Sequence, residues 1–200
     1  MTLQEQFGNI DIYVFDQLLR GRIGPGMRVL DAGCGGGRNL VYLLREGYEV
    51  AGNDADAGAI EQVRRLAGTL APGKVFDFRV EPIERLSFAD LSFDVVIGSA
   101  VLHFARDEAH FAAMLQQMWR VLQPGGVFFA RLASTIGIER DVVPIGHGRF
   151  RLPDGSDRYL VNAAAIETWT ATLGGSLIDP IKTTVVHGQR SMTTWVARRA

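Results

Sequence analysis

A predicted strand that runs straight into a cluster of glycines limits most strongly what this chain can fold into. Residues 28–31 form a short stretch with the apolar pair Val29-Leu30 that ends in an acid, Asp31, and glycines follow at positions 33 and 35–37. In a parallel sheet the carboxyl end of a strand opens a crevice, and glycines let the backbone turn sharply and approach a ligand closely. The feature therefore predicts a ligand site between a buried strand and the helix that follows it.

Strand and helix patterns alternate along the rest of the chain, which is typical of helices packed on both faces of a mostly parallel sheet. A four-residue connection, 187–190, joins the last two apolar stretches and requires an antiparallel pair. We expect an α/β three-layer Rossmann-like sandwich whose seven-stranded, mostly parallel sheet ends in an antiparallel C-terminal hairpin. The patterns predict strands at 28–31, 48–51, 74–80, 93–98, 127–130, 181–186 and 192–198, and helices at 10–20, 40–47, 56–67, 108–122 and 162–174.

The length of 200 residues fits a single domain. Within residues 1–200 we expect an N-terminal helical cap over 1–24. We also expect an inserted hairpin over about 145–161, because the turn sequence 153–156 separates two short strand-like stretches.

The charges nearly cancel, with 21 basic and 22 acidic residues. A field that would hold the chain on nucleic acid or on a membrane surface is therefore not expected. The second half carries the excess of basic residues, so contacts to an anionic partner are expected there. Cys34 is the only cysteine, which excludes an intrachain disulfide, and the start of the chain lacks a signal-peptide pattern. We expect a cytoplasmic protein, either a monomer or a homodimer.

The spacing of the glycines indicates which cofactor the site takes. A dinucleotide fingerprint needs G-x-G-x-x-G, but the sixth position is Arg38 when counted from Gly33 and Leu40 when counted from Gly35. From Met27 to Ala130 the chain instead resembles the class I S-adenosylmethionine-dependent methyltransferases, whose first motif is D-x-G-x-G-x-G. Residues 33–39, with Tyr42 and Gly47-Tyr48, are further similar to the small stand-alone branch that includes tellurite-resistance methyltransferases.

This resemblance implies S-adenosyl-L-methionine as the cofactor and methyl transfer to a small-molecule acceptor. Asp54, at the end of the second strand, matches the family's ribose-binding acid. The acid that contacts adenine in many members falls on Pro82, so either Glu81 or Glu84 takes its place or both are solvated loop carboxylates. The cofactor-binding residues implied in this way are Asp31, Gly33, Cys34, Gly35, Gly37, Asn39, Asp54, Ala55, Ile83 and Ser99.

The loop after the fourth strand resembles the family's loop beneath the reactive methyl group, and it carries His103. His103 is the candidate catalytic base or substrate-orienting group, with a structural loop histidine as the alternative. This loop has no Pro-Pro motif of the kind found in methyltransferases of nucleic-acid bases, which argues against nucleic acid as the substrate. The four histidines show no close ligand spacing, so no metal site is expected.

Acceptor contacts are expected from the N-terminal segment and the inserted hairpin. The candidates are Tyr13 on the N-terminal segment and, on the hairpin, His147, Arg149, Arg151, Arg158 and Tyr159, which together would line a pocket for an anionic small molecule. Packing or a dimer interface is the alternative for these residues. Two other functions remain open at this point, a nicotinamide-dependent oxidoreductase and a non-catalytic S-adenosylmethionine-binding module.

Overall fold

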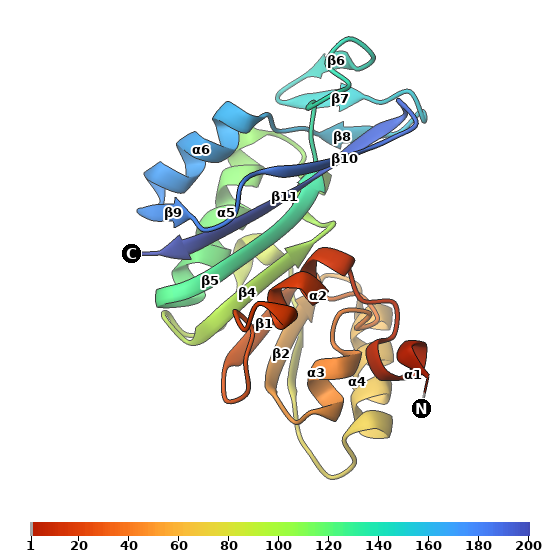
Figure 1. Ribbon diagram of the computed structural model, residues 1–200, viewed down its shortest axis with the longest axis vertical. Coiled ribbons are helices and arrows are strands. Elements are labelled where there is room, and N and C mark those ends of the chain that lie inside the picture. The colour runs from red at the N-terminus through yellow and green to blue at the C-terminus, as the bar shows by residue number, and fades with distance from the viewer. Residues whose placement is uncertain (1) are drawn as a thin grey trace.

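One large sheet organises the computed structural model, which describes residues 2–200 (Figure 1). The main path follows the order β10-β11-β5-β4-β1-β2-β3, and a short strand, β9, pairs with β11. Strands β1 to β5 pair in parallel, whereas β11 runs antiparallel to β5, β9 and β10. The predicted sheet with its antiparallel C-terminal hairpin is confirmed. The strands are β1 (Arg28–Ala32), β2 (Glu49–Asp54), β3 (Asp77–Val80), β4 (Phe93–Ser99), β5 (Leu122–Ala133), β9 (Gly175–Leu177), β10 (Lys182–Val186) and β11 (Arg190–Arg199).

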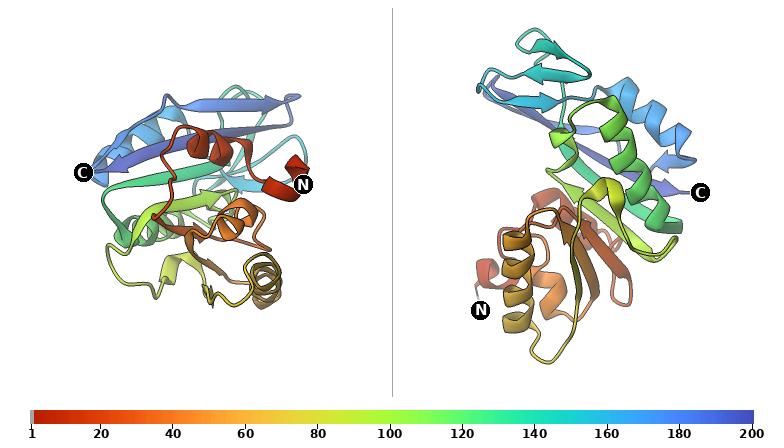
Figure 2. Two further views of the ribbon diagram at one scale, coloured as in Figure 1. Left: turned by 60° about the horizontal axis from the view of Figure 1, so that its bottom comes forward. Right: turned by 180° about the vertical axis from the view of Figure 1, so that it is seen from behind.

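Helices cover both faces of this sheet (Figure 2). Successive strand residues point to opposite faces, so Leu30 and Phe128 pack in the layer that holds α5 and α6, whereas Val29 and Val127 pack in the layer that holds α2, α3 and α4. This alternation produces the three layers that the sequence predicts. The helices are α1 (Leu3–Phe7), α2 (Ile12–Leu19), α3 (Val41–Arg45), α4 (Ala57–Leu70), α5 (Glu108–Val121) and α6 (Ala163–Thr172), with the 3₁₀ turns η1 (Ile83–Arg85) and η2 (Leu102–Phe104).

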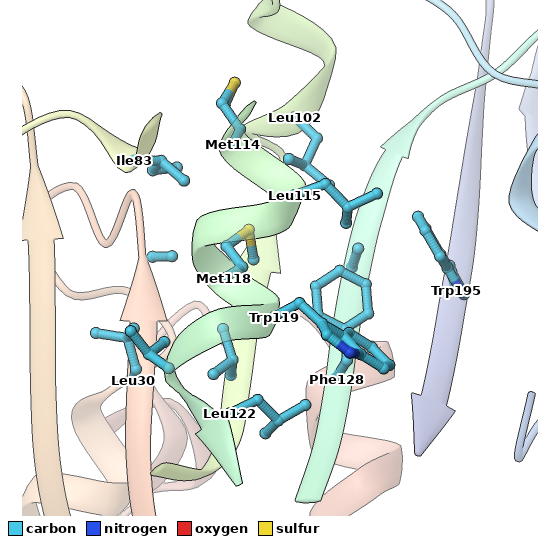
Figure 3. Packing of buried hydrophobic residues seen from close by; sticks show 14 of the residues in the cluster. Leu30, Ile83, Leu102, Met114, Leu115, Met118, Trp119, Leu122, Phe128 and Trp195 are labelled. Carbon is cyan, nitrogen blue, oxygen red and sulfur yellow. The ribbon is translucent and has the colours of Figure 1, made fainter. Parts of the chain in front are cut away.

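Helix α5 anchors the loop that carries His103. Asp107 caps its start by accepting a hydrogen bond from the backbone N–H of His110 at 2.7 Å. Burying each large apolar side chain contributes about 1.5–3 kcal/mol, so the helix is held firmly and fixes the loop before it. Figure 3 shows this packing, which involves Leu30, Met114, Leu115, Met118, Trp119, Phe128 and Trp195.

The inserted segment differs from the predicted hairpin. Strands β7 (Arg149–Arg151) and β8 (Asp157–Tyr159) do form an antiparallel pair, but β6 (Val143–Gly146) joins them in a separate three-stranded sheet. The stretch 143–146 contains a proline and a glycine, which favour a loop in sequence reasoning. The three-residue strand β9 was also not predicted, because so short a strand shows no detectable alternation.

The strand order reverses at β1, which has β2 on one side and β4 on the other. In open α/β sheets ligands bind beyond the carboxyl ends of the strands at such a point. The carboxyl ends of these strands, at Ala32, Asp54 and Ser99, therefore define where to look for a site.

Candidate active site

The glycine loop after β1 leaves its backbone open at one position and tightly packed at two others. Gly33, Gly35 and Gly37 have φ angles of 72°, 52° and 85°, a region that L side chains rarely adopt. A Cβ atom at Gly33 would lie 2.6 Å from Val101 Cγ2, and one at Gly37 would lie 2.6 Å from Val63 Cγ2. At Gly35 the same atom would meet nothing within 4 Å. The backbone at Gly35 is therefore free for a ligand to approach.

Asp54 ties the end of β2 to this loop. One carboxylate oxygen, Oδ2, accepts a hydrogen bond from the Gly35 N–H at 3.0 Å, and Oδ1 accepts one from the Asp56 N–H at 2.9 Å. A carboxylate has about four acceptor positions, so both oxygens can accept further bonds from a ligand. Asp56 itself caps α4 through Gly58 N–H at 2.8 Å, as the sequence predicts.

A small cavity of about 140 Å³ lies beside Asp54. Four of the predicted cofactor residues line it together: Gly33, Asp54, Ala55 and Ile83. Pro82, Glu84, Val101, Phe104, His110 and Met114 complete the lining. We call this space the small cavity.

Glu84, rather than Glu81, reaches the small cavity. The Glu81 carboxylate accepts hydrogen bonds from the backbone N–H and the hydroxyl of Ser87, at 3.0 and 2.5 Å. Both of its oxygens are therefore bonded within the loop. Glu84 Oε1 lies 3.1 Å from His110 Nε2 and 3.8 Å from a guanidinium nitrogen of Arg106. Burial acts to raise the pKa of Glu84, but hydrogen bonds and these neighbours outweigh it and hold the pKa below its usual range. Glu84 is thus an ionised acceptor at the cavity wall.

Asp31 is the most unusual acid of the site. It is 1% exposed, and its Oδ2 atom has no hydrogen-bond partner within residues 2–200. Burial raises its pKa to about 7, and Arg38 and a hydrogen bond with Asn39 oppose that rise. An unpaired buried acceptor is costly, so this atom is suited to a ligand that brings its own donor.

A second buried acid, Asp11 at the start of α2, gathers groups from three other segments. Its Oδ2 atom accepts hydrogen bonds from Ser99 Oγ at 3.0 Å and from Arg131 at 3.1 Å, and Arg38 lies 3.6 Å away. Asn39 Oδ1 accepts the backbone N–H of Asp11 at 3.0 Å. The predicted cofactor residues Asn39 and Ser99 therefore lie in one polar cluster with two arginines, Arg38 and Arg131.

Cys34 has a structural place in this loop. Its side chain packs against Gly52 on β2, where a Cβ atom would lie 3.1 Å from the sulfur. Burial raises the pKa of the Cys34 thiol well above its usual range. The thiol therefore stays protonated and is not a nucleophile, although its backbone belongs to the glycine loop.

A larger cavity of about 290 Å³ lies across the loop after β4. Val101 and Phe104 from this loop face the small cavity, whereas Ala100 and His103 face the larger one. Ala100 has a φ angle of 63°, a strained conformation that often marks a functional site. We call this space the arginine pocket. Its lining is Ala100, His103, Arg131, Ala133, Leu152, Asp154, Ser156, Arg158, Val186, Arg190 and Met192.

The environment of His103 restricts what its ring can do. The side chain is buried, and its Nδ1 atom faces the backbone N–H of Ala133 at 3.3 Å. Burial, together with the positive charges of Arg158 and Arg131, lowers the pKa of His103 to about 4. The ring is therefore neutral at pH 7. Its role in catalysis, as a base or otherwise, stays a prediction.

Of the predicted acceptor residues, only Arg158 lines the arginine pocket. Arg151 forms an exposed, two-point ion pair with Asp157, at 2.7 and 3.1 Å, and Arg149 pairs across the strands with Tyr159. Residues 149, 151, 157 and 159 share one face of this small sheet, while Arg158 is on the other, toward the pocket.

The two remaining acceptor candidates also lie outside the lining of the arginine pocket. His147 lines a separate groove beside Asp107 and Glu108. The Tyr13 hydroxyl is hydrogen-bonded to Thr184 at 2.8 Å.

Sequence reasoning missed Arg131 and Arg190 as site residues. Arg131 directly follows the predicted strand 127–130, so the rule that sites lie at the carboxyl ends of parallel strands was a usable signal for it. Arg190 lies at the start of an antiparallel strand, and no local pattern points to it.

The reversal of strand order, the open glycine loop and the acid at the end of β2 define a class I methyltransferase fold and site. Residues 30–130 match a family described as the methyltransferase domain. The chain therefore belongs to this family, and the predicted relationship to class I S-adenosylmethionine-dependent methyltransferases is confirmed.

Individual proteins agree with this assignment. A ubiquinone biosynthesis O-methyltransferase of Chelativorans sp. (strain BNC1) is 32% identical over 168 residues, which covers 81% of this chain and 63% of that protein. Another of the same name, from Mesorhizobium japonicum, is 39% identical over 80% of this chain and 63% of its own. The chain thus spans under two thirds of these relatives. A solved S-adenosylmethionine-dependent methyltransferase from Methanosarcina mazei has a TM-score of 0.71 and 23% identity, covering 91% of this chain and 96% of that one.

The structure adds one finding on membranes: within residues 2–200, no helix has both the length and the apolar character needed to cross a bilayer. The similarity to tellurite-resistance methyltransferases stays a prediction, because the relatives described above carry a different name.

Proposed function

We propose that this protein transfers the methyl group of S-adenosyl-L-methionine to a small-molecule acceptor. The observation that carries the proposal is the meeting of the open backbone at Gly35, the carboxylate of Asp54 and the unpaired oxygen of Asp31 at one edge of the sheet. Membership of the methyltransferase domain family supports it.

The residues present fit this cofactor. Asp54 would accept hydrogen bonds from the ribose hydroxyls, as charge-assisted bonds of the strong kind. Ala55 and Ile83 offer the walls of the small cavity to the adenine. The unpaired Oδ2 of Asp31 suits an ammonium group, and Arg38, which is 45% exposed, suits a carboxylate, so the pair matches the amino-acid end of the cofactor.

The cofactor supplies an activated methyl group on a sulfonium. The protein then has to orient the acceptor in line and keep water away. Asp11, Ser99 and His103 are buried, which supports the exclusion of water. Arg131 connects the polar cluster around Asp11 to the arginine pocket, because it donates to Asp11 and lines the pocket.

Oxygen is the proposed acceptor atom, on the ground that the two relatives described above are named O-methyltransferases. Cytoplasmic location, the monomeric or dimeric state and the absence of nucleic-acid substrates stay predictions of the sequence.

Incubation with S-adenosylmethionine carrying a labelled methyl group tests the proposal. We expect S-adenosylhomocysteine to form only when an acceptor is present, with the label in a product that is heavier by one methyl group. The rival functions give other outcomes. Tight cofactor binding without methylation of any acceptor would indicate a non-catalytic binding module, and binding of NAD alone would indicate an oxidoreductase.

A further inference from the structure

We propose that the acceptor is a small organic acid that binds in the arginine pocket as an oxyanion, and that His103 donates a hydrogen bond to it instead of removing its proton. This inference rests on the proposed methyl transfer and names the substrate class for it. The nucleophilic oxygen is the anionic one.

The charge of the pocket favours an anion. Three arginines line it from three separate elements: Arg131 on β5, Arg158 on β8 and Arg190 at the start of β11. The only carboxylate in the lining, Asp154, accepts hydrogen bonds from the Ser156 N–H and Oγ at 2.9 and 2.6 Å. The lining therefore carries an excess of two positive charges.

The arginines retain donors for a ligand. Arg131 gives one nitrogen to Asp11, which offsets part of its charge, but its Nε atom is buried with no hydrogen-bond partner in the described chain 2–200. Arg158 donates from Nη1 to the backbone oxygen of Asp157 at 2.8 Å and lies over the Phe104 ring at 4.9 Å, leaving its other nitrogens for a ligand. Guanidinium groups bind oxyanions strongly because their donors match the geometry of a carboxylate.

The hydrogen bonding of His103 opposes a role as base. Its Nδ1 atom accepts the backbone N–H of Ala133, so the proton of the neutral ring resides on Nε2. To act as a base, the ring would need a free lone pair on Nε2, and its proton would then be on Nδ1. In that tautomer the Nδ1–H group and the Ala133 N–H group would point at each other, and the hydrogen bond would be lost. Burial lowers the pKa of His103 to about 4, and the positive charges of Arg158 and Arg131 contribute to this shift. The same two charges favour the ionised form of an acceptor beside the ring.

The remaining walls set the size and shape of the acceptor. They are apolar, from Leu152, Val186 and Met192, and the volume of about 290 Å³ is near the lower limit of ordinary ligand pockets. A compact acid with an apolar body fits these walls. The reaction balances without a base: the oxygen–methyl bond forms, the sulfur–methyl bond breaks, its electron pair stays on sulfur, and no proton moves.

Three simple probes of similar size test the class of acceptor. Benzoate is a carboxylate, 4-nitrophenol is an acidic phenol, and benzamide is a neutral analogue of benzoate. We expect calorimetry on the protein loaded with S-adenosylhomocysteine to detect binding of at least one of the two anions and none of benzamide. With S-adenosylmethionine, mass spectrometry distinguishes a methyl ester from a methyl ether. Equal binding of benzamide and the anions would overturn the inference.

Substitutions in the pocket have a matched control outside it. Arg158→Gln and Arg190→Gln should each weaken anion binding roughly tenfold or more, as loss of a partner from a charge pair does, with cofactor affinity unchanged. Arg151→Gln removes an arginine of the same inserted sheet whose ion pair with Asp157 is exposed, so it should leave both affinities unchanged. If all three substitutions weakened anion binding equally, the overall positive charge of this region, and not the arginine pocket, would account for the binding.

The role of His103 is tested by two replacements and a pH profile. His103→Gln keeps an N–H donor and should retain activity within about tenfold of the wild type, the scale of one modest hydrogen bond, whereas His103→Ala should lose more. A base would make both variants equally poor, with losses of about 10²–10⁴. With benzoate and saturating S-adenosylmethionine, kcat/KM for benzoate should be flat between pH 6 and 9. Methylation of neutral acceptors only would overturn this inference and leave the proposed function intact, while absence of methyl transfer to any acceptor would overturn both.

Discussion

The two cavities on either side of the loop after β4 are built from opposite kinds of charge. The carboxylates of Asp54 and Glu84 line the small cavity, and the buried acid Asp31 lies on β1, the strand that pairs with β2. The arginine pocket holds three arginines and a histidine that stays neutral. Such a division suits a reaction between a cationic donor and an anionic acceptor, since each partner is attracted to its own side of one loop.

The cavities also differ in what supplies their chemistry. The small cavity depends on backbone conformation, because two of its lining residues are Gly33, which has a positive φ angle, and Asp54, whose carboxylate accepts the Gly35 N–H. The arginine pocket depends on long side chains from β5, β8 and β11. We therefore expect substitutions around the small cavity to lower the stability of the fold, and substitutions in the arginine pocket to change mainly which ligand binds.

Gly33→Ala should have the largest effect, because it disturbs the wall that the two cavities share. The added Cβ would lie 2.6 Å from Val101, and the φ angle of 72° is unfavourable for alanine. Left-handed strain of about 1–2 kcal/mol and overpacking of about 1–3 kcal/mol should together lower stability by about 2–5 kcal/mol. Urea unfolding measures this. Gly21→Ala, with a φ angle of 68° and no atom within 4 Å, is the matched control and should lose the strain alone. Equal losses would show that the contact with Val101 is unimportant.

Asp31→Asn should stabilise the folded protein at pH 8 by up to about 4 kcal/mol. The folded pKa of about 7 lies above the ordinary value of 3.8, and each unit of difference corresponds to roughly 1.36 kcal/mol. Between those two pKa values the unfolded state binds fewer protons than the folded state. Wild-type stability should therefore fall as the pH rises from about 4 to 7, and the variant should lack this slope. Identical slopes for the two proteins would contradict an acid of raised pKa at this position.

The same acid should couple cofactor binding to pH. An ammonium group beside Asp31 favours its ionised form, so the affinity for S-adenosylmethionine should be about tenfold lower at pH 6 than at high pH. Calorimetry at pH 6 and 8 measures the difference. Asp31→Asn should bind more weakly and show no such dependence, and an affinity independent of pH in the wild type would place the ammonium elsewhere.

Asp54→Ala should weaken cofactor binding by about 1.5–3 kcal/mol, the worth of hydrogen bonds to a charged group, which is roughly ten- to a hundredfold. Asp56→Ala is the neighbouring control. It removes the cap of α4 and should lower stability by about 1 kcal/mol without changing the dissociation constant. If both variants bind the cofactor alike, the ribose contact lies at another residue.

The smallest effect is expected on the inserted sheet. Replacing Arg149 and Arg151 together by alanine should change the acceptor KM less than twofold and stability by under about 0.5 kcal/mol, because the ion pair of Arg151 is exposed. Steady-state kinetics with an accepted substrate tests this. A clear rise in KM would restore the assignment that the sequence favoured and would weaken the case for Arg158 and Arg190.

Local sequence patterns were sufficient to predict most of the residues and backbone conformations at the small cavity. The positive φ angles of the glycine loop and the caps at Asp56, Asp107 and Asn162 arise within a few residues of chain, so residue type and spacing predict them. Asp54 was predictable too, because in a parallel sheet the carboxyl ends of neighbouring strands meet at one edge.

Only the tertiary structure decided which side chains form the arginine pocket. Arg131, Arg158 and Arg190 come from elements far apart in the chain, and no repeat or spacing relates them. The register of β7 on β8 places Arg158 toward the pocket and Arg149 and Arg151 on the other face. Side chains alternate with a period of two, so a shift of one residue would exchange these faces. Composition showed that the second half of the chain is basic, but the direction of each arginine depends on pairings that form only when distant strands meet.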